Sequence, residues 1–356
     1  MIKIYIDHSI ETYRWDSGLA NYLDLMKQNN IVITNNIQEA DVLCFILDSR
    51  TMFDQLSETK QNMLRNFPRS IIILERVDSA VCWFRDFDKL PNVVAVFKNR
   101  IMRDPQQQNE TMYYGRYHYK LVYEACLDEI KKHQKGRRSF DPAENITENQ
   151  RDISKNWGYS ALKPISPENQ AKVHAVPWDF HSSPLSKRME PFKNIKQNMI
   201  YDVFCVNRDK PGIQGFYRAK ARKIIEKLPY NTLTNPIPKE HYPKKLASSK
   251  IVVCSPGHGE WTHQDGYCMF AGCIIVKPRC DYIKMVPDIY TSDRVVFCQP
   301  DYSDLQEKIT YILEHYDEYK SMIESNRKFI TEWSKEKATI YFCEKVKEVL
   351  QLPCSS

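Results

Sequence analysis

The sequence predicts an α/β fold with two Rossmann-like domains that face a cleft. Short, wholly apolar strands alternate with helix-sized segments in two series, one within residues 1–135 and one within 198–335. Strands that are apolar throughout indicate parallel sheets covered on both faces by helices. The length of 356 residues also suits two cores of roughly 150 residues better than one. We therefore expect ligand-binding loops at the carboxyl ends of the strands.

In the first domain, residues 1–135, apolar runs predict strands and apolar residues at helical spacing predict helices. The helix expected at 19–28, for example, places Leu19, Tyr22, Leu23 and Met26 on one face. The predicted strands are 2–6, 31–34, 40–47, 70–74 and 93–97, and the predicted helices are 19–28, 57–67 and 117–132.

Residues 136–197 break the alternation. The stretch is rich in Pro and Asn and has no sustained periodicity, so we expect a linker and an irregular excursion between the domains. Within it, only the apolar run 173–176 and the aromatic segment after it look ordered.

A second alternating series predicts the C-terminal domain, residues 198–335. Its last helix continues into residues 336–356, which are expected to form a C-terminal helix able to cross back to the first domain. The predicted strands are 200–206, 251–254, 273–276 and 295–298, and the predicted helices are 215–228, 266–270, 302–315, 318–331 and 335–350.

Composition narrows the function classes. Apolar content of 42% with 12% aromatics suffices for packed cores and excludes wholesale disorder. No apolar run of about 18 residues is present, and the N-terminus lacks a signal peptide's layout, so no transmembrane segment and a cytoplasmic location are expected. The net charge of +6 is mild, and no basic stripe interleaved with aromatics predicts nucleic-acid binding. Eleven cysteines occur without a CxxC pair, which favours buried, unpaired thiols.

One glycine-bearing loop carries the strongest functional signal. The chain has only ten glycines, yet four of them lie between residues 257 and 272, directly after an apolar strand. Glycines there let a backbone approach a ligand closely, and the start of the next helix suits a phosphate. The alternative is a plain strand-to-helix turn. The candidate binding residues are Ser255, Gly257, His258, Gly259, Glu260, Trp261, Asp265 and Tyr267.

The end of this segment, Ala-Gly-Cys-Ile-Ile-Val at 271–276, with Met269 before it, resembles the donor-binding signature of GT-B glycosyltransferases. The resemblance is to the group that includes exostosin-like and related bacterial and viral enzymes. Residues 287–290 and the helix opening at 304–305 are similar in order. The resemblance covers about residues 198–350, and the N-terminal half is matched by architecture alone. It implies a nucleotide-sugar donor carrying UDP or GDP, a glycan or glycoconjugate acceptor, and no cofactor.

The resemblance also implies roles for individual residues. Family members often carry Glu five residues before the turn glycine, where it binds the donor ribose. Tyr267 stands at that position here, with Asp265 two residues earlier. Either Asp265 makes the ribose contact or the nucleoside is held differently. Glu260, with Gly259 and His258, is implied to contact the donor sugar or phosphates, and we count Glu260 among the candidate catalytic residues.

A second, basic loop follows the strand at 200–206. The resemblance implies that it faces the donor diphosphate, and Arg208 and Lys210, with Arg218 on the next helix, supply suitable cations. Arg makes bidentate phosphate contacts, and Lys provides a point charge. A solvated basic turn is the alternative.

Asp7 and His8 follow the first strand, where cleft residues are expected, so they are candidates for the catalytic base. A capping Asp with a surface His is the alternative. On the acceptor side, Glu75 follows the fourth strand. Trp178 and His181 are placed to stack on a sugar ring or to form an aromatic plug at the hinge.

No Asp-x-Asp motif stands after a strand, where a metal-dependent glycosyltransferase would need one. Asp86 and Asp88 have the spacing, but they lie in an expected loop or helix end. His258 and His263 lack a zinc spacing. The sequence therefore predicts no metal site, and activity that survives EDTA.

Together these patterns favour a metal-independent glycosyltransferase that moves a hexosyl or pentosyl unit from a nucleotide-diphosphate sugar to a hydroxyl acceptor. Two alternatives stay open. A nucleotide-sugar epimerase shares this bi-lobed shape, and a non-catalytic nucleotide or glycan binder is favoured by Tyr267 in place of the usual Glu.

Overall fold

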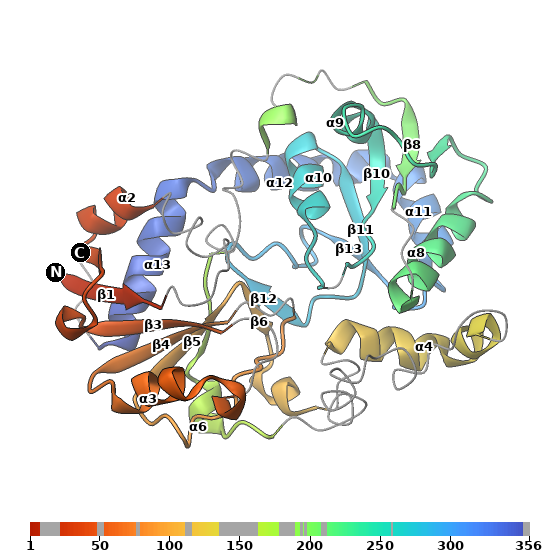
Figure 1. Cartoon of the computed structure of the whole chain (residues 1–356). Helices are drawn as coiled ribbons and strands as arrows, with labels where there is room; N and C mark the ends of the chain where they lie inside the picture. The colour runs from red at the N-terminus through yellow and green to blue at the C-terminus, as the bar shows by residue number, and fades with distance from the viewer. Residues whose placement is uncertain are drawn as a thin grey trace.

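Apolar strands and amphipathic helices build two α/β lobes, each around a parallel sheet (Figure 1). The computed structural model of the chain describes residues 1–7, 22–47, 53–75, 79–110, 116–134, 163–177, 189–192, 195, 198–207, 212–257 and 259–351. In these ranges, no helix is long and apolar enough to cross a membrane.

The first sheet is wholly parallel, in the order β2-β1-β3-β4-β5-β7. All six residues of β3 are buried, as its unbroken apolar run predicts. The chain order reverses between β1 and β3, which makes this a switch point of the sheet. The strands are β1 (Ile2–Ile6), β2 (Ile31–Thr34), β3 (Val42–Leu47), β4 (Ser70–Glu75), β5 (Val93–Lys98) and β7 (Val173–Ala175).

Strand β7 lies in the run 173–176, which the sequence predicts to be ordered within the irregular stretch. Val173 pairs with Val96, and the Val176 backbone N–H donates to the carbonyl of Lys98 at 2.7 Å. Three residues are too few for a periodic signal, so the edge of the neighbouring β5 decides this pairing.

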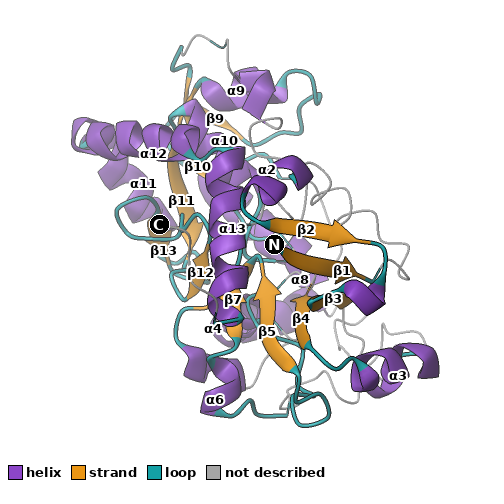
Figure 2. Cartoon of the chain, turned by 90° about the vertical axis from the view of Figure 1, so that its left-hand side faces the viewer, coloured by secondary structure: helices purple, strands orange, loops and turns teal. Residues whose placement is uncertain are grey.

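Helices α2 (Leu23–Gln28), α3 (Glu58–Asn66), α6 (Pro167–Gln170) and α13 (Lys335–Val349) belong to the first lobe. The last of them, α13, runs alongside the first sheet (Figure 2). Its Ala338, Phe342 and Val346 are buried in one cluster with the strands of that sheet. The Phe342 and Phe97 rings meet edge to face at 5.8 Å between centroids. The end of the chain is thus part of the N-terminal core.

The second sheet is also wholly parallel, in the order β13-β11-β10-β8-β9, with its switch point between β8 and β10. Strand β9 and helix α9 are short and fall where the sequence predicts no element. The strands are β8 (Tyr201–Phe204), β9 (Thr232–Leu233), β10 (Ser249–Val253), β11 (Ile274–Pro278) and β13 (Val296–Cys298), and the helices are α8 (Gly212–Ile225), α9 (Tyr242–Ala247), α10 (His263–Ala271), α11 (Leu305–Glu314) and α12 (Lys320–Glu332).

Helix α10 begins before the position that periodicity predicts. The Asp265 carboxylate accepts the backbone N–H of Thr262 at 3.0 Å, which fixes the start of the helix. Gly272 ends it in the left-handed region, at φ 75°. A residue with a side chain adopts that conformation at a cost, so the glycine makes the tight turn into β11.

Helix α4 (Tyr117–Gln134) precedes the expected linker but packs on the second lobe. Its Tyr119, Val122 and Cys126 are buried in one cluster with Tyr217 of α8 and with the strands of the second sheet.

A small antiparallel pair lies between the two lobes (Figure 1). Strand β6 (Arg100–Met102) follows β5 directly, and it pairs with β12 (Ile283–Met285), which follows β11. This pairing brings the carboxyl end of the first sheet against that of the second. Two doubly wound lobes whose carboxyl edges face each other constitute the GT-B architecture.

Candidate functional site

The two predicted donor loops lie at the switch point of the second sheet. The basic loop follows β8, and the glycine-bearing loop follows β10. Since the chain leaves these adjacent strands in opposite directions, a crevice forms outside their carboxyl ends. Topology therefore places the ends of β8 and β10, from which the two loops start, side by side, independently of any motif.

Ser255 and Arg218 anchor the glycine-bearing loop to the helices around it. The Ser255 hydroxyl lies 2.8 Å from that of Tyr302, whose ring stacks on Tyr217 at 4.4 Å between centroids. Arg218 Nη2 donates to the carbonyl of Pro256 at 3.5 Å. Burial lowers the pKa of Arg218 from its ordinary value. These contacts hold Arg218 beside the loop that the sequence assigns to phosphate.

Gly257 is not required by the packing of the protein itself. A Cβ built there would lie 3.6 Å from the Gln214 amide nitrogen and 3.8 Å from Thr262, which are ordinary contacts. The backbone N–H of Gly257 donates to the carbonyl of Gly259 at 3.0 Å. The absence of a side chain at 257 therefore relieves no clash within the protein.

Glu260 is the centre of a buried polar cluster between the lobes. Its Oε2 lies 3.4 Å from Arg100 Nε of β6, and its Oε1 lies 3.4 Å from Nδ1 of His118 at the start of α4. The Tyr282 hydroxyl donates to Oε1 at 3.5 Å. Arg100 and Glu260 are fully buried, and His118 nearly so. We name Arg100, His118, Glu260 and Tyr282 the interlobe cluster.

Charge states within this cluster follow from burial and neighbours. Burial raises the pKa of Glu260, but His118 and the Arg100 guanidinium outweigh it and bring that pKa to about 2. Burial, together with the guanidiniums of Arg116 and Arg100, lowers the pKa of His118 despite the opposite pull of Glu260. Glu260 is therefore ionised and His118 neutral at neutral pH, with Arg100 as the permanent countercharge.

The two nitrogens of His118 differ in their neighbours. Within the part of the chain that the structure describes, neither makes a hydrogen bond, and Nδ1 has the ion-pair contact with Glu260 Oε1 at 3.4 Å. A neutral imidazole with one nitrogen toward a carboxylate and the other unengaged is the arrangement used by histidine general bases.

Asp265 belongs to a second buried group. Lys277 Nζ lies 3.0 Å from its Oδ2 and 3.2 Å from its Oδ1, and the Tyr290 hydroxyl donates to Oδ2 at 2.6 Å. The same Oδ2 accepts the backbone N–H of Thr262. Asp265 and Lys277 are fully buried. The carboxylate that the sequence offers to the donor ribose is thus occupied by the protein's own groups.

The two aromatic candidates nearby are packed against the protein. Tyr267 is half-buried, with its ring 5.0 Å from that of Phe192 between centroids. Trp261 is buried, and its ring stands edge-on to that of His263 at 6.1 Å.

In the first lobe, Asp7 follows β1 and Glu75 ends β4, both at the carboxyl edge of the sheet. Asp7 is buried, and its backbone N–H donates to the carbonyl of Cys44 at 3.0 Å. Glu75 is fully buried, forms an ion pair with Lys98, and accepts the backbone N–H of Trp83 at 2.8 Å. Glu75 therefore positions the segment after β4 and contacts the chain itself.

The carboxylates with Asp-x-Asp spacing are separately engaged. Asp86 accepts the backbone N–H of Phe53 at 3.1 Å, and Asp88 pairs with Lys163 at 2.9 Å. Among the described residues, no group of three or more His, Cys, Asp or Glu side chains could hold a metal ion. Six candidates lie outside the described residues: His8, Trp178, His181, Arg208, Lys210 and His258.

Sequence reasoning missed His118, Tyr282, Tyr290 and Lys277. Lys277 carried a usable signal, because a lysine within the apolar strand 273–278 needs a buried carboxylate partner. The other three carry no local signal: Tyr282 and Tyr290 are recognised only from tertiary contacts within the second lobe, and His118 only from the packing of α4 against it.

A scan against protein-family models finds no match for the chain, and a search of curated proteins finds none. Among solved structures, the chain is similar to a putative UDP-N-acetylglucosamine 2-epimerase from Listeria monocytogenes, at TM-score 0.36 and 10% identity over 98% of this chain and 97% of that one. It is similar to a structure described as trehalose-6-phosphate from E. coli bound with UDP-2-fluoro glucose, at 0.38 and 11% over 96% and 79%. It is also similar to spinosyn forosaminyltransferase SpnP, at 0.34 and 8% over 97% and 99%. These scores are low, and the fold assignment rests on the two strand orders.

Proposed function

We propose that the chain is a glycosyltransferase that moves a sugar from a nucleotide-diphosphate sugar to a hydroxyl group of a glycan or glycoconjugate. The observation that carries the proposal is the meeting of two carboxyl edges at the interlobe cluster, with a glycine-bearing loop at the switch point of the second sheet. Such a crevice suits a ligand that is contacted from both lobes. The sequence resemblance over residues 198–350 adds the donor class.

The donor diphosphate is proposed to lie against the loop 255–260, beside Arg218. Backbone N–H groups and guanidinium charge stabilise the diphosphate as it leaves, without a metal ion. Arg208, Lys210 and His258 are proposed to add to the same site. The acceptor hydroxyl attacks the anomeric carbon, the bond to the diphosphate breaks, and the hydroxyl proton goes to a base.

Two candidates for that base follow from the residues. Asp7 stands at the carboxyl end of β1, at the switch point of the first sheet, and His8 follows it in the sequence. His118 is the second candidate, with Glu260 as the residue that positions it. A carboxylate whose pKa is about 2 is a weak base, so Glu260 is better suited to orienting His118 than to taking the proton.

Binding of the donor is tested by thermal shift against UDP, GDP, CMP, dTDP and their common sugar conjugates, since a ligand bound to the native state raises its stability. One nucleotide family should raise the melting temperature. Gly257→Ala should keep the wild-type melting temperature without ligand, because its Cβ meets only ordinary contacts. It should lose the nucleotide shift, because the methyl group keeps phosphate from the backbone.

Arg218→Ala should weaken the nucleotide shift, whereas Lys223→Ala, at an exposed position further along α8, should not. A transfer assay with the identified nucleotide sugar then tests the reaction. Conversion of the donor sugar without an acceptor would identify an epimerase instead. If no nucleotide of the panel raises the melting temperature, the proposal is wrong, and a glycan-binding protein is the alternative that stays open.

A further inference from the structure

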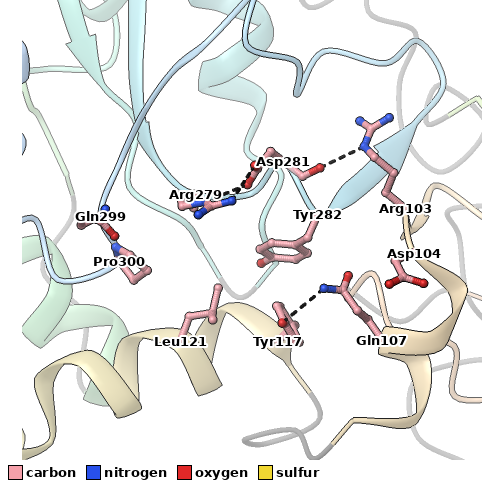
Figure 3. Close-up of a pocket in the computed structure, with 10 residues that line it drawn as sticks. All are labelled: Arg103, Asp104, Gln107, Tyr117, Leu121, Arg279, Asp281, Tyr282, Gln299 and Pro300. Atoms are coloured by element: carbon pink, nitrogen blue, oxygen red, sulfur yellow. Dashed lines mark hydrogen bonds and ion pairs between the residues drawn. The ribbon is translucent and has the colours of Figure 1, made fainter.

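A pocket of about 580 Å³ opens between the lobes, beside the interlobe cluster. One wall comes from η3 (Pro105–Asn109) and the first turns of α4, and the other from the segments that follow β11 and β13. Side chains from both walls point into one hollow (Figure 3). The pocket is lined by Arg103, Asp104, Gln107, Tyr117, Leu121, Arg279, Asp281, Tyr282, Gln299 and Pro300.

Charge in this pocket is balanced within the protein. Arg279 donates two hydrogen bonds to Asp281, at 3.3 and 3.0 Å, and Asp281 helps to raise the pKa of Arg279. Arg103 is paired with Asp288 at 2.9 Å and donates to the carbonyl of Ile283 at 3.0 Å. An anionic ligand would lie near Asp281 and Asp104 as well as near the two arginines. The lining therefore favours an uncharged ligand over a phosphate or a carboxylate.

The pocket is also amphipathic. Tyr117 and Tyr282 meet edge to face at 4.7 Å between centroids, and with Leu121 they form an apolar side. The amides of Gln107 and Gln299 supply hydrogen-bond donors and acceptors on the rim. A pyranose matches this distribution, because its C–H face is apolar and its hydroxyl groups point outward from the ring. The volume lies in the range of small-molecule sites.

We propose that this pocket binds an uncharged sugar unit, and that the unit belongs to the acceptor glycan. The assignment of this sugar unit to the acceptor glycan rests on the proposed function. Tyr282 connects the two, since its ring lines the pocket and its hydroxyl lies 3.5 Å from Glu260 in the donor-side loop. A sugar held there contacts Tyr282 of the interlobe cluster and is one side chain away from Glu260.

The test is direct sugar binding by the full chain, measured by saturation-transfer NMR and calorimetry. The probes are maltotriose, cellotriose, mannotriose and chitotriose, with glucose 6-phosphate, sialyllactose, uridine and guanosine as comparisons. At least one neutral oligosaccharide should bind, and neither charged sugar should bind more tightly. Gln299→Trp, which fills the mouth from an exposed position, should weaken binding at least tenfold.

Gln38→Trp is the matched control, at an exposed position in the first lobe, and should bind as the wild type does. Gln107→Ala removes a single amide and should weaken binding several-fold, which keeps the test valid if the tryptophan variant fails to fold. The proposal is overturned if none of the four neutral probes binds. It is also overturned if the Gln299→Trp and Gln107→Ala variants both bind as tightly as the wild type. Stronger binding of glucose 6-phosphate that Gln299→Trp abolishes overturns it too.

The two proposals fail separately. A nucleotide shift without neutral-sugar binding would refute the assignment of the pocket, and the glycosyltransferase proposal would stand. Neutral-sugar binding that Gln299→Trp abolishes, without any nucleotide shift, supports the pocket and removes the glycosyltransferase.

Discussion

Arg100 Nε lies 3.4 Å from Glu260 Oε2, and this buried contact joins the two lobes. Arg100 begins β6 just beyond the end of β5, whereas Glu260 lies in the loop after β10. Bulk water does not solvate these two charges, since the exposed fraction is 1% for the arginine side chain and 0% for the glutamate. Removal of either partner would therefore leave the other charge buried and uncompensated.

Arg100→Met should lower the free energy of unfolding by about 3–5 kcal/mol, because it leaves the Glu260 carboxylate buried without its permanent countercharge. Urea denaturation at pH 7 measures the loss. The double variant Arg100→Met, Glu260→Gln should recover part of it, because the orphaned charge is gone.

Arg279→Met is the control for an exposed ion pair. The side chains of Arg279 and Asp281 are 58% and 39% exposed, so the expected loss is about 1 kcal/mol or less. Equal losses in Arg100→Met and Arg279→Met would mean that the interlobe pair contributes no more than a surface contact.

The pKa of Glu260 predicts acid sensitivity. Its folded pKa is about 2, against an ordinary value of 4.5, so its contribution is complete above pH 4.5 and is lost as pH falls from 4.5 toward 2. The full shift corresponds to stability on the order of 3 kcal/mol. Glu260→Gln should flatten the dependence of unfolding free energy on pH in this window. An unchanged slope would mean that other carboxylates cause the acid loss.

His118 predicts a second loss at milder pH. Because its folded pKa lies below 6.5, the unfolded state takes up the proton first, and stability falls as pH drops below 6.5. His118→Gln should remove this earlier part of the slope, and it should also reduce the part below pH 4.5, because His118 is a main cause of the low pKa of Glu260. Chemical denaturation at half-unit steps from pH 7.5 to 3 separates the two.

The sequence predicts the lobes well and their junction poorly. Strands β3 and β4 are unbroken apolar runs, and Gly272 marks a turn, so local pattern is enough for each. Strands β6 and β12 have three residues each and exist only as partners of one another. Periodicity carries no information at that length, and pairing across two lobes is decided by their packing.

The same division holds in the candidate site. Glu260 is found from chain order, because it lies in a glycine-bearing loop after a strand. Its partners Arg100 and His118 are distant in sequence and meet it only when the lobes dock. The start of α10 at His263 is set by the Thr262–Asp265 contact, which helical periodicity does not contain.

Asp265→Asn should destabilise the fold rather than weaken donor binding alone. The carboxylate is enclosed by Lys277, Tyr290 and the Thr262 backbone, so its loss leaves Lys277 buried without a countercharge. We expect Asp265→Asn and Lys277→Met to unfold more readily by about 3–5 kcal/mol. The increment in melting temperature produced by a saturating nucleotide should be unchanged in Asp265→Asn. A stable Asp265→Asn variant that loses the nucleotide increment would restore the ribose contact that the sequence offers.

The last prediction separates the candidate bases by their effect on rate. If His118 takes the acceptor proton, His118→Gln should lower kcat at least about 100-fold, the lower end of the usual contribution of a general base. Glu260→Gln should lower kcat about tenfold or more, and it should also move the acid limb of the pH–rate profile to lower pH. The reason is that Glu260 raises the pKa of His118, so removing its charge makes the imidazole less basic. A variant that is merely less stable would lower the amplitude of the profile without moving that limb. Asp7→Asn is the competing measurement, and a large loss of kcat there, with His118→Gln near the wild-type rate, would assign the proton transfer to the end of β1 instead.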